Sequence, residues 1–200
     1  MSTHTSETIA ALIGSRICHD LISPIGAVTN GLELLALTGV PDGPEMNLVH
    51  DSAVSANARI MLFRLAFGLA APGQSVSCDE LCRAWQGGQT GKPVRLIWSG
   101  PDSLPRTEAR AILLACLCAE PALPQGGEIG VTRTGGDWQL TITGRALAFD
   151  ATLWGCLSGR AAPNGVTPAQ VQFILLPQVL AEMGRQARMT QTQDRLTVMF

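Results

Sequence analysis

The sequence has only one lysine, Lys92, and little charge of either sign: charged residues make up 15% of its 200 residues, and the formal net charge is −2. Such a chain does not favour nucleic acid or an anionic membrane as its main partner, because both are bound through clustered positive charge. It also lacks an apolar run long enough to span a bilayer. Its first residues lack the basic start and apolar centre of a signal peptide. We therefore expect a cytoplasmic protein.

Residues that bind metal ions are few and poorly spaced for that purpose. The three histidines, His4, His19 and His50, all lie in the first quarter of the chain, and the six cysteines include no C-x-x-C pair. We therefore predict no metal site and interpret most cysteines as reduced thiols of a core. A hydrophobic content of 46% is typical of a globular chain, and this length suffices for one large or two small domains.

The first part of the chain has the pattern of two long helices. A polar tail over residues 1–6 precedes a helix expected over residues 6–37, where apolar residues recur at helical spacing. Glycine and proline crowd residues 38–44 and predict a loop, and a second helix is expected over residues 45–69. Two such helices form an antiparallel hairpin that cannot bury its apolar faces alone. We therefore predict that two copies pair into a four-helix bundle.

Residues 70–75 predict a boundary between a helical domain, residues 1–71, and a second domain, residues 75–200. The second domain mixes short helices with strands, which predicts an α+β layer of helices on a mixed sheet. Within it, Gly135-Gly136-Asp137 predicts a hairpin turn. Helices are expected over residues 78–85, 107–119, 151–157 and 168–183. Strands are expected over residues 94–98, 129–133, 138–143, 186–190 and 196–199.

His19 lies on the first predicted helix, in the run Arg16-Ile17-Cys18-His19-Asp20-Leu21-Ile22-Ser23-Pro24-Ile25. At about 100° of rotation per residue, the apolar residues of this helix fall within roughly one third of its circumference, almost opposite His19. The histidine is therefore expected to face solvent or a partner, beside the carboxylate of Asp20. Its own face carries mostly small side chains, so another protein could approach the ring closely. The residues of this His19 face are Ser15, Arg16, Ser23, Gly26 and Asn30. The apolar stripe on the opposite side consists of Ile13, Ile17, Leu21, Ile25, Val28, Leu32 and Leu35.

Residues 19–25, His-Asp-Leu-Ile-Ser-Pro-Ile, resemble the phosphoacceptor helix of two-component histidine kinases. That pattern is His, Glu or Asp, Leu, any residue, Thr or Ser, Pro, and Leu or Ile. Residues 30–35 and 63–68 look more specifically like bacterial histidine phosphotransferases of the ChpT family. The resemblance implies that His19 accepts a phosphoryl group and that Asp20 orients or deprotonates its ring. It also implies a docking surface for receiver domains, to which we assign Arg16, Ile22, Ser23, Gly26 and Asn30.

The second domain looks like the ATP-binding domain of histidine kinases, the α/β sandwich known as the Bergerat fold. By this resemblance Cys118 stands where kinases carry the asparagine that holds magnesium, and a thiol is no hard oxygen ligand. The adenine-recognising aspartate and the second glycine are missing from residues 143–147. The glycine-rich turn over residues 87–93 lacks the hydroxyl and the spacing of a phosphate loop. We therefore expect this chain to bind no cofactor.

A phosphorylatable histidine without the residues that use ATP predicts a phosphorelay. The family implies a CckA-like hybrid histidine kinase whose receiver domain donates the group, CtrA-like and CpdR-like response regulators that accept it, Mg²⁺ held by the receiver, and a place in cell-cycle control. Two alternatives stay open: an active kinase with unusual nucleotide boxes, and a non-catalytic scaffold that binds receivers. His50 and Asp51 form a second histidine–aspartate pair, but no flanking pattern supports it, and we interpret both as surface residues.

Overall fold

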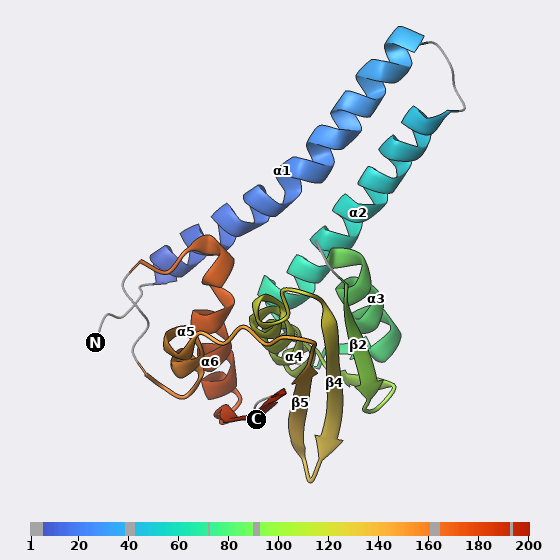
Figure 1. Ribbon diagram of the computed structural model, residues 1–200. Coiled ribbons are helices and arrows are strands. Elements are labelled where there is room, and N and C mark those ends of the chain that lie inside the picture. The colour runs from blue at the N-terminus through green and yellow to red at the C-terminus, as the bar shows by residue number, and fades with distance from the viewer. Residues whose placement is uncertain (1–5, 39–42, 72, 90–92, 161–164, 193) are drawn as a thin grey trace.

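The computed structural model describes residues 6–38, 43–71, 73–89, 93–160, 165–192 and 194–200. Most of the predicted polar tail with His4, most of the loop over residues 38–44 and the middle of the turn over residues 87–93 lie outside these ranges. A long two-helix arm projects from a compact C-terminal body (Figure 1). This is the predicted α+β architecture, with the helical hairpin first and the sheet after it.

The arm consists of helix α1, Ser6–Thr38, and helix α2, Pro44–Phe67, which run antiparallel and pack along each other. Both agree with the predicted ranges to within two residues. Helix α2 begins with Pro44. Proline has no amide hydrogen, but this costs no hydrogen bond here because amides in the first turn of a helix have no partner within the helix. Helix α1 continues through an internal proline, Pro24, which removes one backbone donor from the middle of the helix.

At Gly31 the helices α1 and α2 lie so close together that there is no room for a side chain. The residue is buried, and a β-carbon added to it would lie 2.4 Å from Cγ2 of Val49 on α2. Real β-carbons do not approach other carbons so closely, so any larger residue here would require the Val49 side chain or one of the helices to shift. A hydrogen atom at residue 31 therefore lets the two helices of the arm pack directly against each other.

The C-terminal end of α2 belongs to the core of the body. Its last two turns bury Leu62, Leu65 and Ala66 almost completely. They pack against helix α3, Cys78–Gly88, and helix α4, Arg106–Ala119. The predicted division at residues 71 and 75 stays a prediction, because this helix contributes to both parts.

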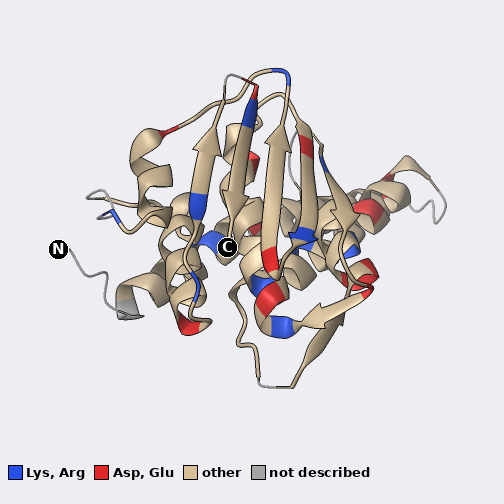
Figure 2. Cartoon of the chain, turned by 90° about the horizontal axis from the view of Figure 1, so that it is seen from below, with Lys and Arg blue, Asp and Glu red and all other residues tan. Residues whose placement is uncertain are grey.

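The body contains a five-stranded sheet in the order β2-β4-β5-β7-β6 and a two-stranded ribbon of β1 and β3. In the large sheet β2 and β4 are parallel, and every other neighbouring pair is antiparallel. The strands lie side by side with the helices behind them (Figure 2). The bounds in the sheet are β2 Val94–Ser99, β4 Gly127–Thr134, β5 Asp137–Thr143, β6 Arg188–Gln191 and β7 Arg195–Met199, and in the ribbon β1 Ser75–Ser77 and β3 Ser103–Pro105.

One face of this sheet carries the core. Along β5 the buried residues alternate, and Trp138, Leu140 and Ile142 are fully buried. Helix α4 packs on this side and has a continuously buried stretch from Ala111 to Ala119. The remaining helical elements are η1 Glu120–Ala122, α5 Ala151–Leu157, η2 Pro168–Gln170 and α6 Gln172–Glu182.

Most of the predicted elements are confirmed, with three differences. The turn between β4 and β5 has positive φ angles at Gly135 and Gly136, as its glycines predicted. The ribbon of β1 and β3 was missed. The helix predicted over residues 168–183 is divided into a 3₁₀ turn and α6. The strand predicted over residues 186–190 begins later, at Arg188.

Candidate phosphoacceptor site

His19 lies on α1 with 87% of its side chain exposed, so its predicted outward orientation is confirmed. Its ring nitrogen Nδ1 lies 2.9 Å from Oδ1 of Asp20, the next residue. When Nδ1 carries the proton and donates it to this carboxylate, Nε2 keeps a free electron pair. Within the described ranges no residue hydrogen-bonds to Nε2. The arrangement presents a nucleophilic nitrogen to solvent.

Asp20 is much less exposed than His19, at 22% of its side chain, and both of its carboxylate oxygens have partners. Oδ1 faces the His19 ring, and Oδ2 lies 3.3 Å from Nε of Arg16, one helical turn earlier. An arginine at this spacing can pair with an aspartate on the same helix face. The carboxylate is therefore held between a cation and the imidazole.

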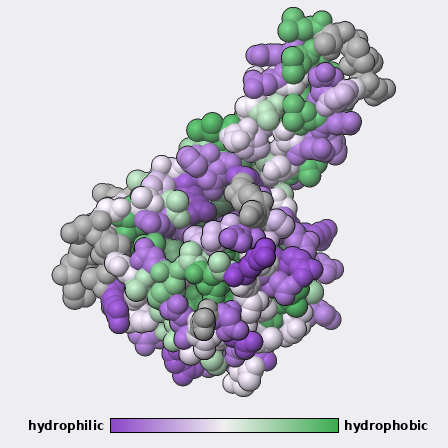
Figure 3. Space-filling model, viewed as in Figure 1, coloured by the Kyte–Doolittle hydropathy of each residue, from purple (hydrophilic) through white to green (hydrophobic). Residues whose placement is uncertain are grey.

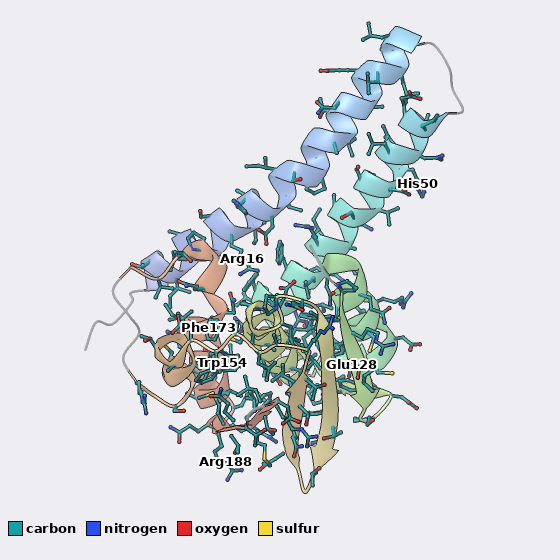
Figure 4. All side chains as sticks on the ribbon, in the orientation of Figure 1. Arg16, His50, Glu128, Trp154, Phe173 and Arg188 are labelled. Atoms are coloured by element: carbon teal, nitrogen blue, oxygen red, sulfur yellow. The ribbon has the colours of Figure 1, made fainter. Side chains whose placement is uncertain are left out.

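Arg16 connects this turn of α1 to the C-terminal body, as Figure 4 shows where α1 meets the end of α6. Its side chain is only 11% exposed, and Nη1 donates to the backbone oxygen of Ala169 and to Oε1 of Gln172, the latter at 3.0 Å. Gln172 is completely buried and donates to the backbone oxygen of Leu117 at 3.2 Å. Arg16 thus has partners within the chain, and its contact with a receiver stays a prediction.

Arg59 of α2 holds the backbone of the same turn. An α-helical carbonyl normally accepts from the amide four residues later, but the residue four after Asp20 is Pro24, which has no amide hydrogen. Nη1 of Arg59 donates to the Asp20 carbonyl oxygen at 2.7 Å and replaces the missing donor. Arg59 is 9% exposed. Sequence analysis missed it, although a proline inside a helix signals a carbonyl in need of a partner.

Glu120, the first residue of η1, is a further titratable group near this turn. Burial raises the pKa of the Glu120 carboxyl; the Asp20 carboxylate also raises it, whereas Arg16 and Arg59 lower it. The carboxylate of Asp20 and the charges around it therefore form one electrostatic cluster at the junction of the arm and the body.

A pocket of about 220 Å³ opens beside His19. It is formed by α1 on one side and by η2 of the body, with the residue before it, on the other. A partner that reaches the imidazole would therefore meet both parts of the chain. The pocket is lined by Ser15, Arg16, His19, Asp20, Thr167, Pro168 and Ala169.

The other predicted docking residues leave the surface of α1 beyond His19 accessible. Ile22 is 70% exposed, and Ser23 and Asn30 are exposed as well. Gly26 is half-buried, and a β-carbon added to it would have no other atom within 4 Å. The surface is open enough for a partner, and the role of these residues in receiver docking stays a prediction.

The second histidine–aspartate pair lies on α2, where Figure 4 shows His50 on the side away from α1. Nδ1 of His50 lies 3.4 Å from Oδ1 of Asp51. Both side chains are highly exposed, at 72% and 82%, which confirms that they are surface residues.

Cys118, which the resemblance places at the magnesium-holding position of a kinase, lies in the hydrophobic core of the body. Cys118 is fully buried, and burial raises the pKa of its thiol well above the ordinary value. Trp154 and Phe173 meet edge to face with ring centroids 5.4 Å apart. They line a cavity of about 420 Å³ together with Phe149, whose ring stacks on Trp154. The expectation that no nucleotide binds stays a prediction.

Two kinds of structure are absent from the part of the chain that the structure describes. There, no three or more His, Cys, Asp or Glu side chains lie close enough together to hold a metal ion. Nor does any helix in it combine the length and apolarity needed to cross a membrane.

Comparison with known proteins decides the family. The model of the histidine phosphotransferase C-terminal domain matches residues 78–195. The chain belongs to the histidine phosphotransferase family. A curated relative, protein phosphotransferase ChpT of Brucella abortus (strain 2308), is 35% identical over 177 residues, which cover 85% of this chain and 84% of the relative. A solved structure of a bacterial phosphotransferase is similar with a TM-score of 0.79 and 30% identity, over 98% of this chain and 96% of that one. Histidine phosphotransfer is therefore the function of this family member.

Proposed function

We propose that this histidine phosphotransferase relays a phosphoryl group between receiver domains, and that His19 carries the group. The observation that supports this most directly is the combination at His19: the ring is 87% exposed, and its Nδ1 faces the carboxylate of Asp20. A nucleophile in a relay has to reach a residue of another protein, which only an exposed side chain can do. The family match supports phosphotransfer but names no donor or acceptor.

The proposed chemical step is an in-line transfer. Nε2 of His19 attacks the phosphorus of an aspartyl phosphate on the receiver; the N–P bond forms while the O–P bond to the receiver aspartate breaks, and the electron pair stays with that carboxylate. Positive charge develops on the imidazole, and Asp20 stabilises it through the Nδ1 proton. Transfer to a second receiver reverses these bond changes. Mg²⁺ is proposed to be held by the receiver.

The proposed partners are the receiver domain of a CckA-like hybrid histidine kinase as donor and CtrA-like and CpdR-like response regulators as acceptors. These assignments rest on the resemblance of the first helix and on the curated relative. The docking surface is proposed to run along α1 from Arg16 past Ile22 and Ser23 to Asn30, with Gly26 allowing close approach.

We also propose that the chain acts as a homodimer through its arm. Each residue of the predicted apolar stripe on α1 is only half-buried or exposed in the single chain, with Ile25 at 51% and Leu32 at 53%. Ile60 of α2 is 48% exposed and lines an apolar groove with Ile17 and Leu21. Apolar atoms on the arm reach the surface in several patches (Figure 3). Pairing two hairpins would bury this face.

A substitution on that face tests the dimer. Ile25→Asp should convert the protein to monomers, because a carboxylate cannot be buried in the seam of a bundle, as measured by light scattering after size-exclusion chromatography. Leu37→Asp is the control, since Leu37 is 83% exposed and lies on the His19 side of α1. Dimers of the Ile25 variant as stable as the unsubstituted protein would contradict the proposed interface.

A phosphotransfer time course tests the relay. Purified protein mixed with a receiver domain phosphorylated on its aspartate should gain a phosphoryl group and lose it when a second receiver is added. Incubation with labelled ATP alone should leave the protein unlabelled. Self-labelling from ATP would identify an active kinase instead. Receiver binding without any transfer would identify a scaffold.

A further inference from the structure

Asp20 is held by other residues at both its backbone carbonyl and its side-chain carboxylate. At the backbone end, Pro24 removes the amide that would pair with the Asp20 carbonyl, and Nη1 of Arg59 donates to this oxygen at 2.7 Å. At the side-chain end, Nε of Arg16 lies 3.3 Å from Oδ2, while Oδ1 faces Nδ1 of His19 at 2.9 Å. The carboxylate therefore meets the imidazole from a position that two arginines define.

Both arginines are largely buried, which separates them from ordinary surface cations. Arg59 is 9% exposed, and the side chain of Arg16 is 11% exposed. Arg16 donates to the backbone oxygen of Ala169 and to Gln172, whose amide in turn donates to the backbone oxygens of Leu117 and Ala169. A solvated arginine pays side-chain entropy to hold one geometry, whereas Arg16, buried and with several partners, has already lost that freedom. Arg59 is held through Nη1, and its buried Nε has no hydrogen-bond partner among the described residues.

We propose that Arg16 and Arg59 are positioning residues that fix Asp20, and through it the His19 ring, with Gln172 of α6 holding Arg16 in place. The inference rests on the proposed function, in which His19 is the phosphoacceptor. It gives the C-terminal body a part in the transfer: its buried Gln172 acts on the reacting imidazole through a chain of hydrogen bonds without touching the phosphoryl group.

The chemical reason is the choice of nitrogen. A ring whose Nδ1 donates to a fixed carboxylate keeps its proton on that nitrogen and leaves Nε2 as the nucleophile. If the carboxylate is free to rotate, the ring samples both tautomers and several orientations, and fewer encounters with a receiver are productive. Partners that orient a metal-bound histidine from outside act in the same way, and losing one costs roughly 10-fold to 100-fold in activity.

The first test separates positioning from docking. Gln172→Ala should slow transfer at saturating receiver by roughly 10-fold to 100-fold, with little change in receiver affinity measured by calorimetry. Arg16→Gln should slow transfer at saturating receiver by a similar factor, in addition to any loss of affinity from its proposed place on the docking surface. Gln172 is completely buried, so its substitution cannot remove a direct contact with a receiver. Arg64→Gln is the matched control, because Arg64 is an exposed arginine of α2 that pairs only loosely with Glu80, at 3.5 Å.

The second test reads the ring itself. In the unsubstituted dimer, ¹⁵N NMR of the His19 imidazole should show the proton on Nδ1, and in Arg16→Gln the signals should shift toward a mixture of tautomers. Arg59→Met should show the same mixture. Arg59→Lys should restore the single tautomer, because an ammonium group can still donate to the Asp20 carbonyl. Circular dichroism on each variant gives the folded fraction, to which all rates are normalised.

The outcomes are distinct. Unchanged rates and tautomers in Arg16→Gln and Gln172→Ala would overturn the positioning role, and a loss confined to receiver affinity in Arg16→Gln would leave Arg16 with its proposed docking role alone. If the unsubstituted protein accepts no phosphoryl group at all, the proposed function fails, while the NMR comparison still decides whether the arginines fix the ring.

Discussion

The arm carries the same dipeptide twice, as His19-Asp20 on α1 and as His50-Asp51 on α2, and the two pairs differ in what surrounds the aspartate. In each, Nδ1 of the histidine faces Oδ1 of the next residue, at 2.9 Å in the first pair and 3.4 Å in the second. Both rings are exposed. The histidines alone would not distinguish the two places.

The aspartates do distinguish them. The side chain of Asp20 is 22% exposed, its carboxylate pairs with Arg16, and its backbone carbonyl accepts a hydrogen bond from Arg59. The side chain of Asp51 is 82% exposed. Among the residues that the structure describes, no arginine pairs with Asp51. We propose that the carboxylate held between two arginines, and not the exposed imidazole alone, distinguishes the phosphoacceptor pair from the surface pair. Predictions can test this contrast by changing one pair and using the other as control.

The largest effect is expected from the histidines. His19→Ala should abolish phosphoryl transfer from a phosphorylated receiver, because the accepting nitrogen is gone, whereas His50→Ala should transfer at the unsubstituted rate. Both side chains are exposed, so neither change should disturb folding. Intact-mass spectrometry of the phosphoprotein gives the measurement, and a phosphoryl group that persists on the His19 variant would contradict the assignment.

The aspartates should show the next largest effect. Asp20→Asn should slow the transfer step by roughly 10²-fold to 10⁴-fold, the range typical of a lost general base or orienting group, because the amide cannot stabilise an imidazolium. Asp51→Asn should have no effect. Single-turnover rates are compared with receiver binding for each variant; equal losses of rate and affinity at Asp20 would indicate a docking role.

Glu120 offers a smaller test of the cluster around Asp20. Because burial, reinforced by Asp20, raises the pKa of Glu120 above 4.5, its ordinary value, the folded protein holds this proton more tightly than the unfolded chain does. Its free energy of unfolding is therefore expected to fall as the pH rises from about 4.5 through the folded-state pKa. Glu120→Gln should flatten this part of the curve and stabilise the protein at neutral pH.

Urea denaturation from pH 4 to pH 8 measures this slope. Glu33→Gln, at an exposed residue of α1, controls for the loss of one carboxylate. A Glu120 variant that is less stable at neutral pH would mean that the electrostatic attraction of Arg16 and Arg59 for the Glu120 carboxylate outweighs the cost of its burial.

The smallest effect is expected from an attempt to copy the site. Asn47→Arg places an arginine four residues before Asp51, the spacing of Arg16 and Asp20. Both residues are exposed, so stability measured by thermal unfolding should change by no more than about 0.5 kcal/mol. In a His19→Ala background, His50 should remain unphosphorylated, because the new arginine has no buried partners to fix it. Phosphorylation of His50 would show that a nearby arginine alone is sufficient.

Sequence reasoning identified the parts of the fold that repeat a pattern. The two long helices and the alternating strand β5 were predicted to within two residues, because glycine and proline mark the loop between the helices and β5 alternates along its length. The ribbon of β1 and β3 was missed because three-residue strands carry too little alternation to recognise. The 3₁₀ turn Pro168–Gln170 begins with a capping box at Thr167 and Gln170, and the periodicity does not show that α6 starts only at Gln172.

The candidate site divides in a similar way. His19 and Asp20 are neighbours within one local motif, so the sequence suffices to propose them. Arg59 lies 39 residues from Asp20 in the sequence, and Gln172 lies 156 residues from Arg16. Only the packing of α2 and of the body against α1 brings these pairs together. A helical wheel places Arg16 near the face of His19, but it cannot show that the body covers the arginine.

Gly31 has a consequence for evolution of the arm. Because a side chain at residue 31 would collide with Val49 of α2 near the free end of the arm, a replacement would act as a wedge that pushes against α2. Two wedges, one from each protomer of a dimer, would alter the cross-section of the whole bundle, including the parts far from residue 31. The position should thus tolerate fewer substitutions than any solvent-facing residue around it, although it touches neither the imidazole nor a visiting protein.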